Sequence, residues 1–355
     1  MPFDEALPIM KGLILIFLWV LGVGCQRSCD GGASQEIKAM GQTMGTFYSV
    51  TVVQNYNTQR ISRDRLKSLI DERLLEINDV FSTYRHDSTI SRFNRSNQQF
   101  FIAKDEFSHV INRAQEISSI TRGAFSIFVD PLIDLWGFDR GGRRDQRPLD
   151  SAVRSTLATV RSFAIAQDGN VINKIDPRTS INLSGIAKGF GVDQVAMLIE
   201  RLGYQNFMVE IGGDIVARGH NIRGKPWVIG IGHPHFVGIR NKLLARLSLM
   251  DKAIASSGTY INFFSDEGKT YSHIIDPRTG YPISTDLISV SIIAPDCISA
   301  DAWATAAMIL GEDEVRELLT RNSDLSAMFV KKTGNELGVS FAGNFQKYIS
   351  DDTAR

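Results

Sequence analysis

The sequence predicts an α+β fold, and two observations support that prediction. Segments with the spacing of strands and of amphipathic helices follow one another irregularly, and several neighbouring strands are close enough in sequence to form hairpins. A regular alternation of strand and helix, which would indicate a parallel α/β sheet, is not present in the pattern, and neither is a solenoid period. We therefore expect mixed sheets with packed helices.

The expected elements follow from the spacing of apolar residues. The segment 46–53 (TFYSVTVV) predicts the first strand, because β-branched and aromatic side chains dominate it. A helix is expected from about Ser62, a capping residue, to Phe81. By the same reasoning, further helices are expected at 105–121, 185–203 and 299–310, and strands at 206–211, 227–232, 243–249, 271–275 and 287–294. The charged segment 139–150 predicts a surface loop.

Composition excludes several classes of protein. The 355 residues carry 39 Lys and Arg against 39 Asp and Glu, whereas a nucleic-acid-binding protein would show a basic excess. Hydrophobic residues make up 43% and charged residues 22%, values typical of a globular protein and not of a disordered one. Three cysteines are too few for a disulfide scaffold and lack the spacing of a zinc site.

The N-terminus has the pattern of a targeting segment. Thirteen residues without a charge (12–24) match the ~7–15 of a signal-peptide core and fall short of the ~20 of a membrane-spanning helix. Cys25 follows Gly-Val-Gly, which resembles a bacterial lipobox, although Leu21 stands four rather than three positions before it. We expect a lipoprotein signal peptide at 1–24, a flexible tether at 25–40 and the folded body at 41–355. A cleaved signal without lipid and an uncleaved anchor remain alternatives.

The segment 181–193 (INLSGIAKGFGVD) brings three glycines within seven residues to the start of an expected helix. Bare amides at a helix N-terminus attract anions, and Lys188 adds a positive charge there. The spacing is neither that of a Walker A loop nor that of a dinucleotide-binding fingerprint. A phosphate cradle and an ordinary strand-to-helix turn both remain open. The Gly-Gly-Asp at 212–214 is likewise either an anion nest or a turn.

Two other sites combine groups with catalytic chemistry. Asp301 and Thr305 are four residues apart, so they share one face of a helix and can offer oxygen ligands to Mg²⁺. They can equally serve the helix dipole and the backbone. His273 adjoins a strand pattern, where a histidine can act as an acid or base near neutral pH or have only a structural role.

Taken in order, the motifs of this chain resemble the ApbE family of FAD:protein FMN transferases. The motifs that carry the resemblance are MGT (44–46), FSTY (81–84), GAFS (123–126), LSGIAKG (183–189), IGGD (211–214), SSG (256–258), HIIDPRTG (273–280) and ADAWAT (300–305). The resemblance spans about residues 41–350. It implies an ApbE-like, T-fold-related α+β fold in a single catalytic body.

The resemblance also implies an activity. FAD is then the substrate, and a Thr (or Ser) hydroxyl of an acceptor protein attacks the FMN-side phosphorus while AMP leaves. Such phosphoryl transfer depends mainly on positioning and on neutralising charge, which Mg²⁺ on the diphosphate supplies. The implied metal ligands are Gly185, Asp301 and Thr305. The implied flavin and adenine contacts are Met44, Tyr84, Ala124, Phe125, Ser126, Asn182, Lys188 and Ile275. His273 is our candidate to assist deprotonation of the incoming hydroxyl, and with Asp301 it forms the predicted catalytic pair.

The chain departs from the family pattern at two positions near the nucleotide. Ser126 and Asn182 stand where the family commonly has Asp. If those carboxylates serve mainly as hydrogen-bond acceptors, FAD binding survives the change. If their negative charge matters, affinity or rate falls.

Two other functions share these features. A Mg²⁺-dependent FAD pyrophosphatase would use water in place of the acceptor hydroxyl, and a non-catalytic flavin-binding lipoprotein would release no AMP. The resemblance further implies a membrane redox subunit as acceptor. Together with the lipobox, it implies attachment through lipidated Cys25 to the periplasmic side of a bacterial membrane. No nucleic-acid partner is expected.

Overall fold

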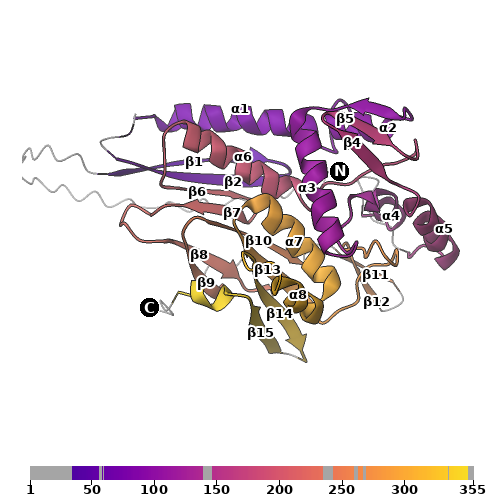
Figure 1. The fold of residues 1–355 in the computed structure, drawn as a ribbon. Coiled ribbons are helices and arrows are strands. Elements are labelled where there is room, and N and C mark those ends of the chain that lie inside the picture. Colours follow the sequence, from indigo (N-terminus) through magenta and orange to yellow (C-terminus); the bar gives the residue numbers. More distant parts are fainter. Residues whose placement is uncertain are drawn as a thin grey trace, which may run out of the picture. The chain divides into compact units, whose positions relative to one another are not determined.

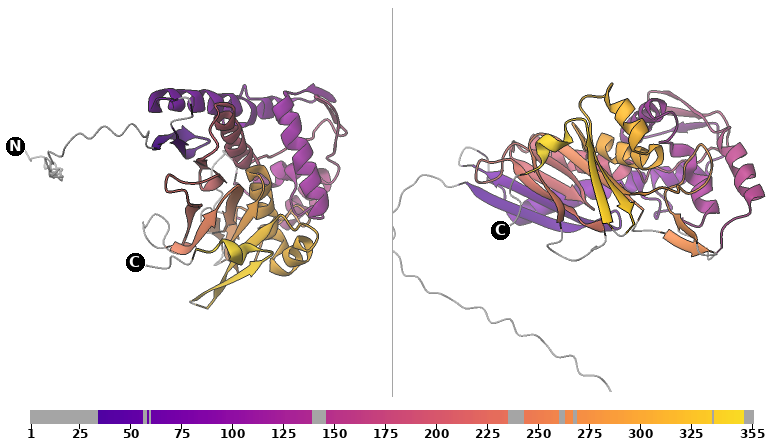
Figure 2. Two further views of the ribbon diagram at one scale, coloured as in Figure 1. Left: turned by 60° about the vertical axis from the view of Figure 1, so that its left-hand side comes forward. Right: turned by 90° about the horizontal axis from the view of Figure 1, so that it is seen from below.

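The computed structural model describes residues 34–55, 58, 60–138, 146–234, 243–259, 263–266, 269–334 and 336–350. Within this part of the chain, the main sheet has eight strands, all paired antiparallel. In pairing order they are β1 (Gln35–Thr43), β2 (Thr46–Gln54), β6 (Phe207–Ile211), β7 (Asp214–Arg218), β10 (Lys252–Gly258), β13 (Leu287–Ala294), β14 (Ser326–Thr333) and β15 (Glu336–Ala342). The turned views of Figure 2 show the indigo N-terminal strands and the yellow C-terminal strands at opposite ends of this sheet.

Smaller sheets flank the main one. They are β3 (Phe100–Ile102) with β5 (Val171–Lys174) and β4 (Ile165–Asp168), the hairpin of β8 (Trp227–Gly232) and β9 (Leu243–Leu249), and the hairpin of β11 (Phe263–Asp266) and β12 (Lys269–Ser272).

The helices form where apolar residues recur at helical spacing and a cap is available. Ser62 caps the first helix by accepting the backbone N–H of Arg65 at 3.2 Å. The helices are α1 (Arg63–Phe81), α2 (Thr89–Arg95), α3 (Asp105–Ile120), α4 (Asp130–Leu135), α5 (Asp150–Val160), α6 (Ala187–Arg201), α7 (Cys297–Leu310) and α8 (Glu312–Leu319), with short 3₁₀ turns η1 (Ile127–Val129) and η3 (Phe345–Tyr348).

The two faces of the main sheet are covered differently (Figure 1). Helices α1, α6 and α7 pack on one face and share a large apolar core with it, in which Trp303 and Phe207 are buried. The β8–β9 hairpin and η3 cover the other face, where Trp227, Leu247 and Phe345 pack against the sheet. A third apolar cluster joins α4 and α5 to the β11–β12 hairpin. Burial on both faces explains the nearly continuous apolar run of β13.

The predicted fold class is confirmed: residues 34–355 form one compact unit of mixed sheets and helices. The expected helices correspond to α1, α3, α6 and α7, and the expected strand 46–53 corresponds to β2. The expected strand 271–275 ends earlier, because β12 stops at Ser272 and Ile275 forms only an isolated bridge with Pro282. Of the expected loop 139–150, residues 139–145 lie outside the described part of the chain, and the last residue, Asp150, begins α5.

The expected tether at 25–40 is wrong over its last six residues. These lie in β1, which pairs along its whole length with β2 and turns Ile37 and Ala39 into the core. The compact unit accordingly starts at Ser34 rather than at residue 41. The signal peptide and residues 25–33 of the expected tether lie outside the described residues. Within the described residues, no helix has the length and apolarity needed to cross a bilayer.

Candidate active site

A cavity of about 340 Å³ opens between α6, α7, β10 and the segments 124–133 and 273–277. Its lining combines apolar side chains with a few charged and hydroxyl groups, the composition expected of a small-molecule site. Ten predicted site residues line it: Ala124, Phe125, Ser126, Asn182, Gly185, Lys188, His273, Ile275, Asp301 and Thr305. The fold therefore brings four separate parts of the sequence to one cavity.

The other two predicted residues, Met44 and Tyr84, line a neighbouring cavity of about 560 Å³. Ser184 and Lys188 line both cavities, so the two adjoin. Met44 occupies the turn of the β1–β2 hairpin in the left-handed region, with φ of 48°. Tyr84 is 79% exposed.

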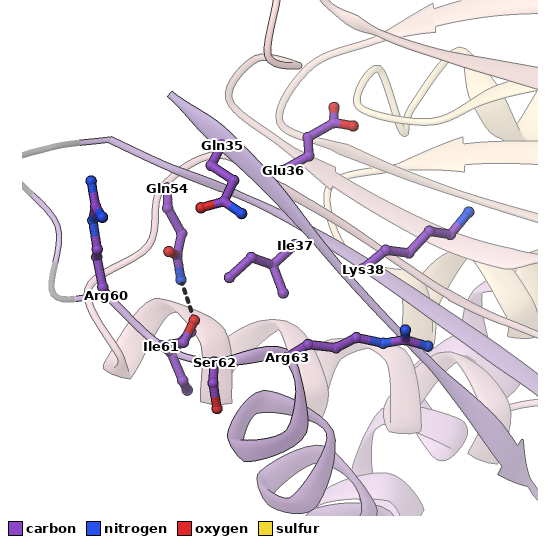
Figure 3. Close-up of a pocket in the computed structure, with 9 residues that line it drawn as sticks. All are labelled: Gln35, Glu36, Ile37, Lys38, Gln54, Arg60, Ile61, Ser62 and Arg63. Atoms are coloured by element: carbon purple, nitrogen blue, oxygen red, sulfur yellow. Dashed lines mark hydrogen bonds between the residues drawn. The ribbon is translucent and has the colours of Figure 1, made fainter. Parts of the chain in front are cut away.

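A third cavity, of about 470 Å³, lies between the start of β1 and the N-terminus of α1. Figure 3 shows its lining, in which Gln54 donates a hydrogen bond to the carbonyl oxygen of Ile61 at 3.0 Å. It shares no lining residue with the two adjoining cavities. It is therefore separate from the predicted site.

Lys188, in the first turn of α6, lies between two buried carboxylates. It forms an ion pair with Asp214, which is 1% exposed, and its Nζ lies 3.8 Å from Oδ1 of Asp301. Burial lowers the pKa of Lys188, but the attraction of Asp301 and Asp214 outweighs it and holds the pKa above its usual value. Burial, followed by the like charge of Asp301, raises the pKa of Asp214 to about 7. Lys188 is thus a fixed cation in the cavity wall.

Asp301 uses its two carboxylate oxygens differently. Oδ2 accepts the backbone N–H of Gly189 at 3.0 Å, while Oδ1 is the oxygen closer to Lys188. This contact requires α6 and α7 to approach closely. A Cβ atom at position 189 would lie only 2.2 Å from the carbonyl oxygen of Cys297, so only glycine fits there.

Gly185, Asp301 and Thr305 form an all-oxygen set suited to a hard divalent cation. A Cβ at position 185 would lie 3.1 Å from Oγ1 of Thr305, so the absence of a side chain keeps space open beside that hydroxyl. Oγ of Ser257 lies 3.4 Å from the same atom. The described residues contain no group of three or more His, Cys, Asp or Glu that could hold a metal, and the set above has a single carboxylate. These residues fit Mg²⁺, which accepts hydroxyl, carbonyl and water oxygens besides carboxylates.

His273 lies on the cavity wall just beyond β12. The ring of Phe138 meets its imidazole edge-on, with 6.4 Å between the centroids. The next residues fold into a tight turn in which Asp276 accepts hydrogen bonds from the backbone and guanidinium of Arg278. That turn fixes the backbone on which His273 is carried.

Ser126 and Asn182 both act as hydrogen-bond acceptors. Oγ of Ser126 caps η1 by accepting the N–H of Phe128 at 3.2 Å. Oδ1 of Asn182 accepts the N–H of Ser184 at 3.0 Å, which shapes the turn into α6. At these two positions, where the chain differs from the family pattern, the local structure therefore needs a hydrogen-bond acceptor but not a negative charge.

The structure also gives contacts to motif residues that were not among the predicted site residues. Asp214 holds Lys188, and Gly212 and Gly213 before it form the turn of the β6–β7 hairpin, with φ of 57° and 93°. The Gly-Gly-Asp segment is thus a turn. Its acidic residue, Asp214, was the sequence feature that could have identified the partner of Lys188. Asp193, from α6, accepts the backbone N–H groups of Cys297 and Ile298.

Comparisons with known proteins show strong similarity over most of the chain. The model of the ApbE family matches residues 44–329. The FAD:protein FMN transferase of Haemophilus influenzae is 36% identical over 346 residues, which cover 96% of this chain and 97% of that protein. The FAD:protein FMN transferase of Vibrio cholerae is 34% identical over 340 residues, covering 95% and 98%.

Solved structures show the same similarity. The flavin transferase ApbE from Vibrio cholerae matches with a TM-score of 0.79 at 33% identity, over 89% of this chain and 99% of that one. The flavinyl transferase ApbE from Pseudomonas stutzeri, in its apo form, also matches with a TM-score of 0.79, at 28% identity over 90% and 98% of the two chains.

Proposed function

This chain belongs to the ApbE family, and we propose that it is an FAD:protein FMN transferase. The observation that carries the proposal is the convergence of twelve family-implied residues on two adjoining cavities, with Lys188 at their junction. FAD has two aromatic ends joined by a diphosphate. The two cavities can each hold one aromatic end, and Lys188 at their junction can contact the diphosphate between them.

The proposed reaction is a phosphoryl transfer from FAD to the acceptor protein. The oxygen of an acceptor Thr or Ser hydroxyl forms a bond to the phosphorus of the FMN half, and the bond from that phosphorus to the oxygen shared with AMP breaks. AMP leaves with the electron pair of that bond, and the hydroxyl proton passes to a base. We propose that His273, which lies on the cavity wall, accepts this proton.

In the proposed enzyme, Asp301, Thr305 and the carbonyl of Gly185 would hold Mg²⁺. When bound, Mg²⁺ neutralises negative charge on the diphosphate and on the departing AMP. The chain itself contributes the cation of Lys188. Asp214 holds this cation in place before the reaction, so no reorganisation free energy is spent on placing it during the reaction. Amides of the first turn of α6 add partial positive charge beside it.

We further propose that the acceptor is a membrane redox subunit and that lipidated Cys25 anchors the enzyme on the periplasmic side of the membrane. The lipobox-like pattern before Cys25 and the family resemblance support this. Fractionation tests it: the wild-type protein should require detergent for release, while a Cys25→Ala variant should be soluble or remain as an uncleaved precursor. Release of the wild-type protein without detergent would contradict the anchor.

The function is tested by incubating the full chain with FAD, MgCl₂ and a candidate acceptor protein. We expect the denatured acceptor to gain the mass of FMN and an equal amount of AMP to appear. An Asp301→Ala variant should abolish both while still binding FAD. AMP with free FMN and an unmodified acceptor would instead identify a pyrophosphatase, and flavin binding without AMP a carrier protein.

A further inference from the structure

The N-terminus of α7 is held by a carboxylate from α6. Asp193 is partly buried, and its Oδ1 accepts the N–H of Cys297 at 2.9 Å while its Oδ2 accepts the N–H of Ile298 at 2.8 Å. These are the first two amides of α7, which have no partner inside the helix. A carboxylate that receives two backbone amides at these distances is a charge-assisted contact with defined geometry.

The two helices cap each other. While α6 supplies Asp193 to the first amides of α7, α7 supplies Oδ2 of Asp301 to the N–H of Gly189, an amide of the first turn of α6. Gly189 and Asp193 are four residues apart, and so are Cys297 and Asp301. Each pair therefore lies on one helix face, and the two faces meet.

This reciprocal contact determines which oxygen of Asp301 reaches the cavity. Oδ2 is committed to Gly189, so Oδ1, the oxygen 3.8 Å from Nζ of Lys188, is left for the site. The register of α7 against α6 sets the position of Oδ1. Asp193 fixes that register one helical turn before Asp301, and the close approach at Gly189 leaves little room for sliding.

We propose that Asp193 is a positioning residue for the transfer reaction, which acts through α7 to place Oδ1 of Asp301. The inference rests on the proposed function and adds a residue that touches neither cavity. Burial raises the pKa of Asp193 to about 7, and the amides of Cys297 and Ile298 oppose that shift by favouring the carboxylate. Nearby Asp296 raises the same pKa, and Arg218 lowers it.

The same helix supplies a matched control. Asp296 is the N-cap of α7 and accepts the N–H of Ser299 at 3.0 Å. An Asp296→Ala variant therefore removes a carboxylate cap from the same helix end without removing the contact between α7 and α6. A role limited to helix capping predicts similar effects for the Asp193 and Asp296 variants, and a positioning role predicts different ones.

The experiment measures kcat, KM for FAD and the half-saturating Mg²⁺ concentration for wild-type, Asp193→Ala, Asp193→Asn and Asp296→Ala full-length proteins. We expect Asp193→Ala to lower kcat at least tenfold and to raise the half-saturating Mg²⁺ concentration, with KM for FAD within twofold. Asp193→Asn keeps one acceptor and should be intermediate. Asp296→Ala should stay within twofold of wild type in kcat.

Amide hydrogen exchange gives a readout that does not depend on activity. The Gly189 amide should exchange faster in Asp193→Ala and remain protected in Asp296→Ala. Equal losses of kcat in the two alanine variants, or unchanged Gly189 protection in Asp193→Ala, would overturn the inference. If Asp193→Ala does not fold, the same comparison is made with Asp193→Asn. If the wild-type protein transfers no FMN, the proposed function fails, and Gly189 exchange alone decides whether Asp193 positions Asp301.

Discussion

Nζ of Lys188 lies 3.8 Å from Oδ1 of Asp301 and forms an ion pair with Asp214. One cation thus serves two carboxylates that are 5% and 1% exposed. When both carboxylates are ionised, the three groups carry one net negative charge. The three groups together therefore still attract a further cation beside Asp301. Lys188 offsets the repulsion between the two buried carboxylates.

Replacing Lys188 with Met tests this relationship. The substitution leaves Asp214 buried without a cation, so the free energy of unfolding should fall by about 3–5 kcal/mol. The transfer rate should fall on the order of 100-fold, because the diphosphate loses a preorganised charge. Denaturant unfolding and single-turnover rates measure the two effects. A stability equal to that of the wild type would show that the ion pair is dispensable.

A Gly189→Ala substitution should separate α6 from α7. Its Cβ would lie 2.2 Å from the carbonyl oxygen of Cys297, and backbone has to move to relieve that clash. We expect a loss of about 3 kcal/mol of unfolding free energy. Gly191→Ala is the control on the same helix, because the atom nearest to its Cβ would be the flexible end of Met44, at 3.0 Å. Similar stability losses in both variants would contradict the close helix contact.

A Gly185→Ala substitution should affect metal use more than stability. The new methyl group would lie 3.1 Å from Oγ1 of Thr305 and would occupy the space beside that hydroxyl. The half-saturating Mg²⁺ concentration should rise about tenfold, while the unfolding free energy should change by less than about 1 kcal/mol. Titration of the transfer rate with MgCl₂ measures the first effect. An unchanged Mg²⁺ dependence would argue against this position for the metal.

The buried Lys174 predicts a pH dependence of stability. Its Nζ donates to the carbonyl oxygens of Phe93 and Ser96 at 2.7 Å each, and burial lowers its pKa from 10.5 to about 8. Between pH 8 and pH 10.5 the folded protein has released this proton while the unfolded chain still binds it. The contribution of Lys174 to unfolding free energy therefore rises with pH, by up to about 1.4 kcal/mol per pH unit.

The measurement compares wild type with Lys174→Met by denaturant unfolding from pH 7 to pH 10. The difference in unfolding free energy should be constant below pH 8 and should then grow in favour of the wild type. Other titrating groups act alike in both proteins and cancel in the difference. A difference that stays flat to pH 10 would show that Lys174 keeps its ordinary pKa.

The sequence predicted those helices and strands whose pattern of apolar residues is complete within one short segment. Helices α1, α3, α6 and α7 show helical spacing of apolar residues within one segment, and β2 is rich in β-branched side chains. The ordered motifs likewise singled out twelve residues, all of which line at least one of the two cavities. Strand β1 was missed because its polar composition conceals an alternation in which only Ile37, Ala39 and Thr43 are buried.

Contacts between distant segments could not be predicted in this way. The order of the strands depends on pairings such as β2 with β6, which lie more than 150 residues apart. The contact of Asp193 with α7 and that of Asp214 with Lys188 each join two elements that meet only in the folded protein. A carboxylate that caps its own helix has a recognisable spacing, whereas one that caps a neighbouring helix has none.

The contact between α6 and α7 also has a consequence for biosynthesis. It joins Gly189 to Asp301 across 112 positions, so the site exists only after α7 has been synthesised and has docked against α6. An incomplete chain cannot assemble the site, and so it does not consume FAD. A ligand that binds only the assembled site favours the completed fold, so FAD should raise the free energy of unfolding of the full chain.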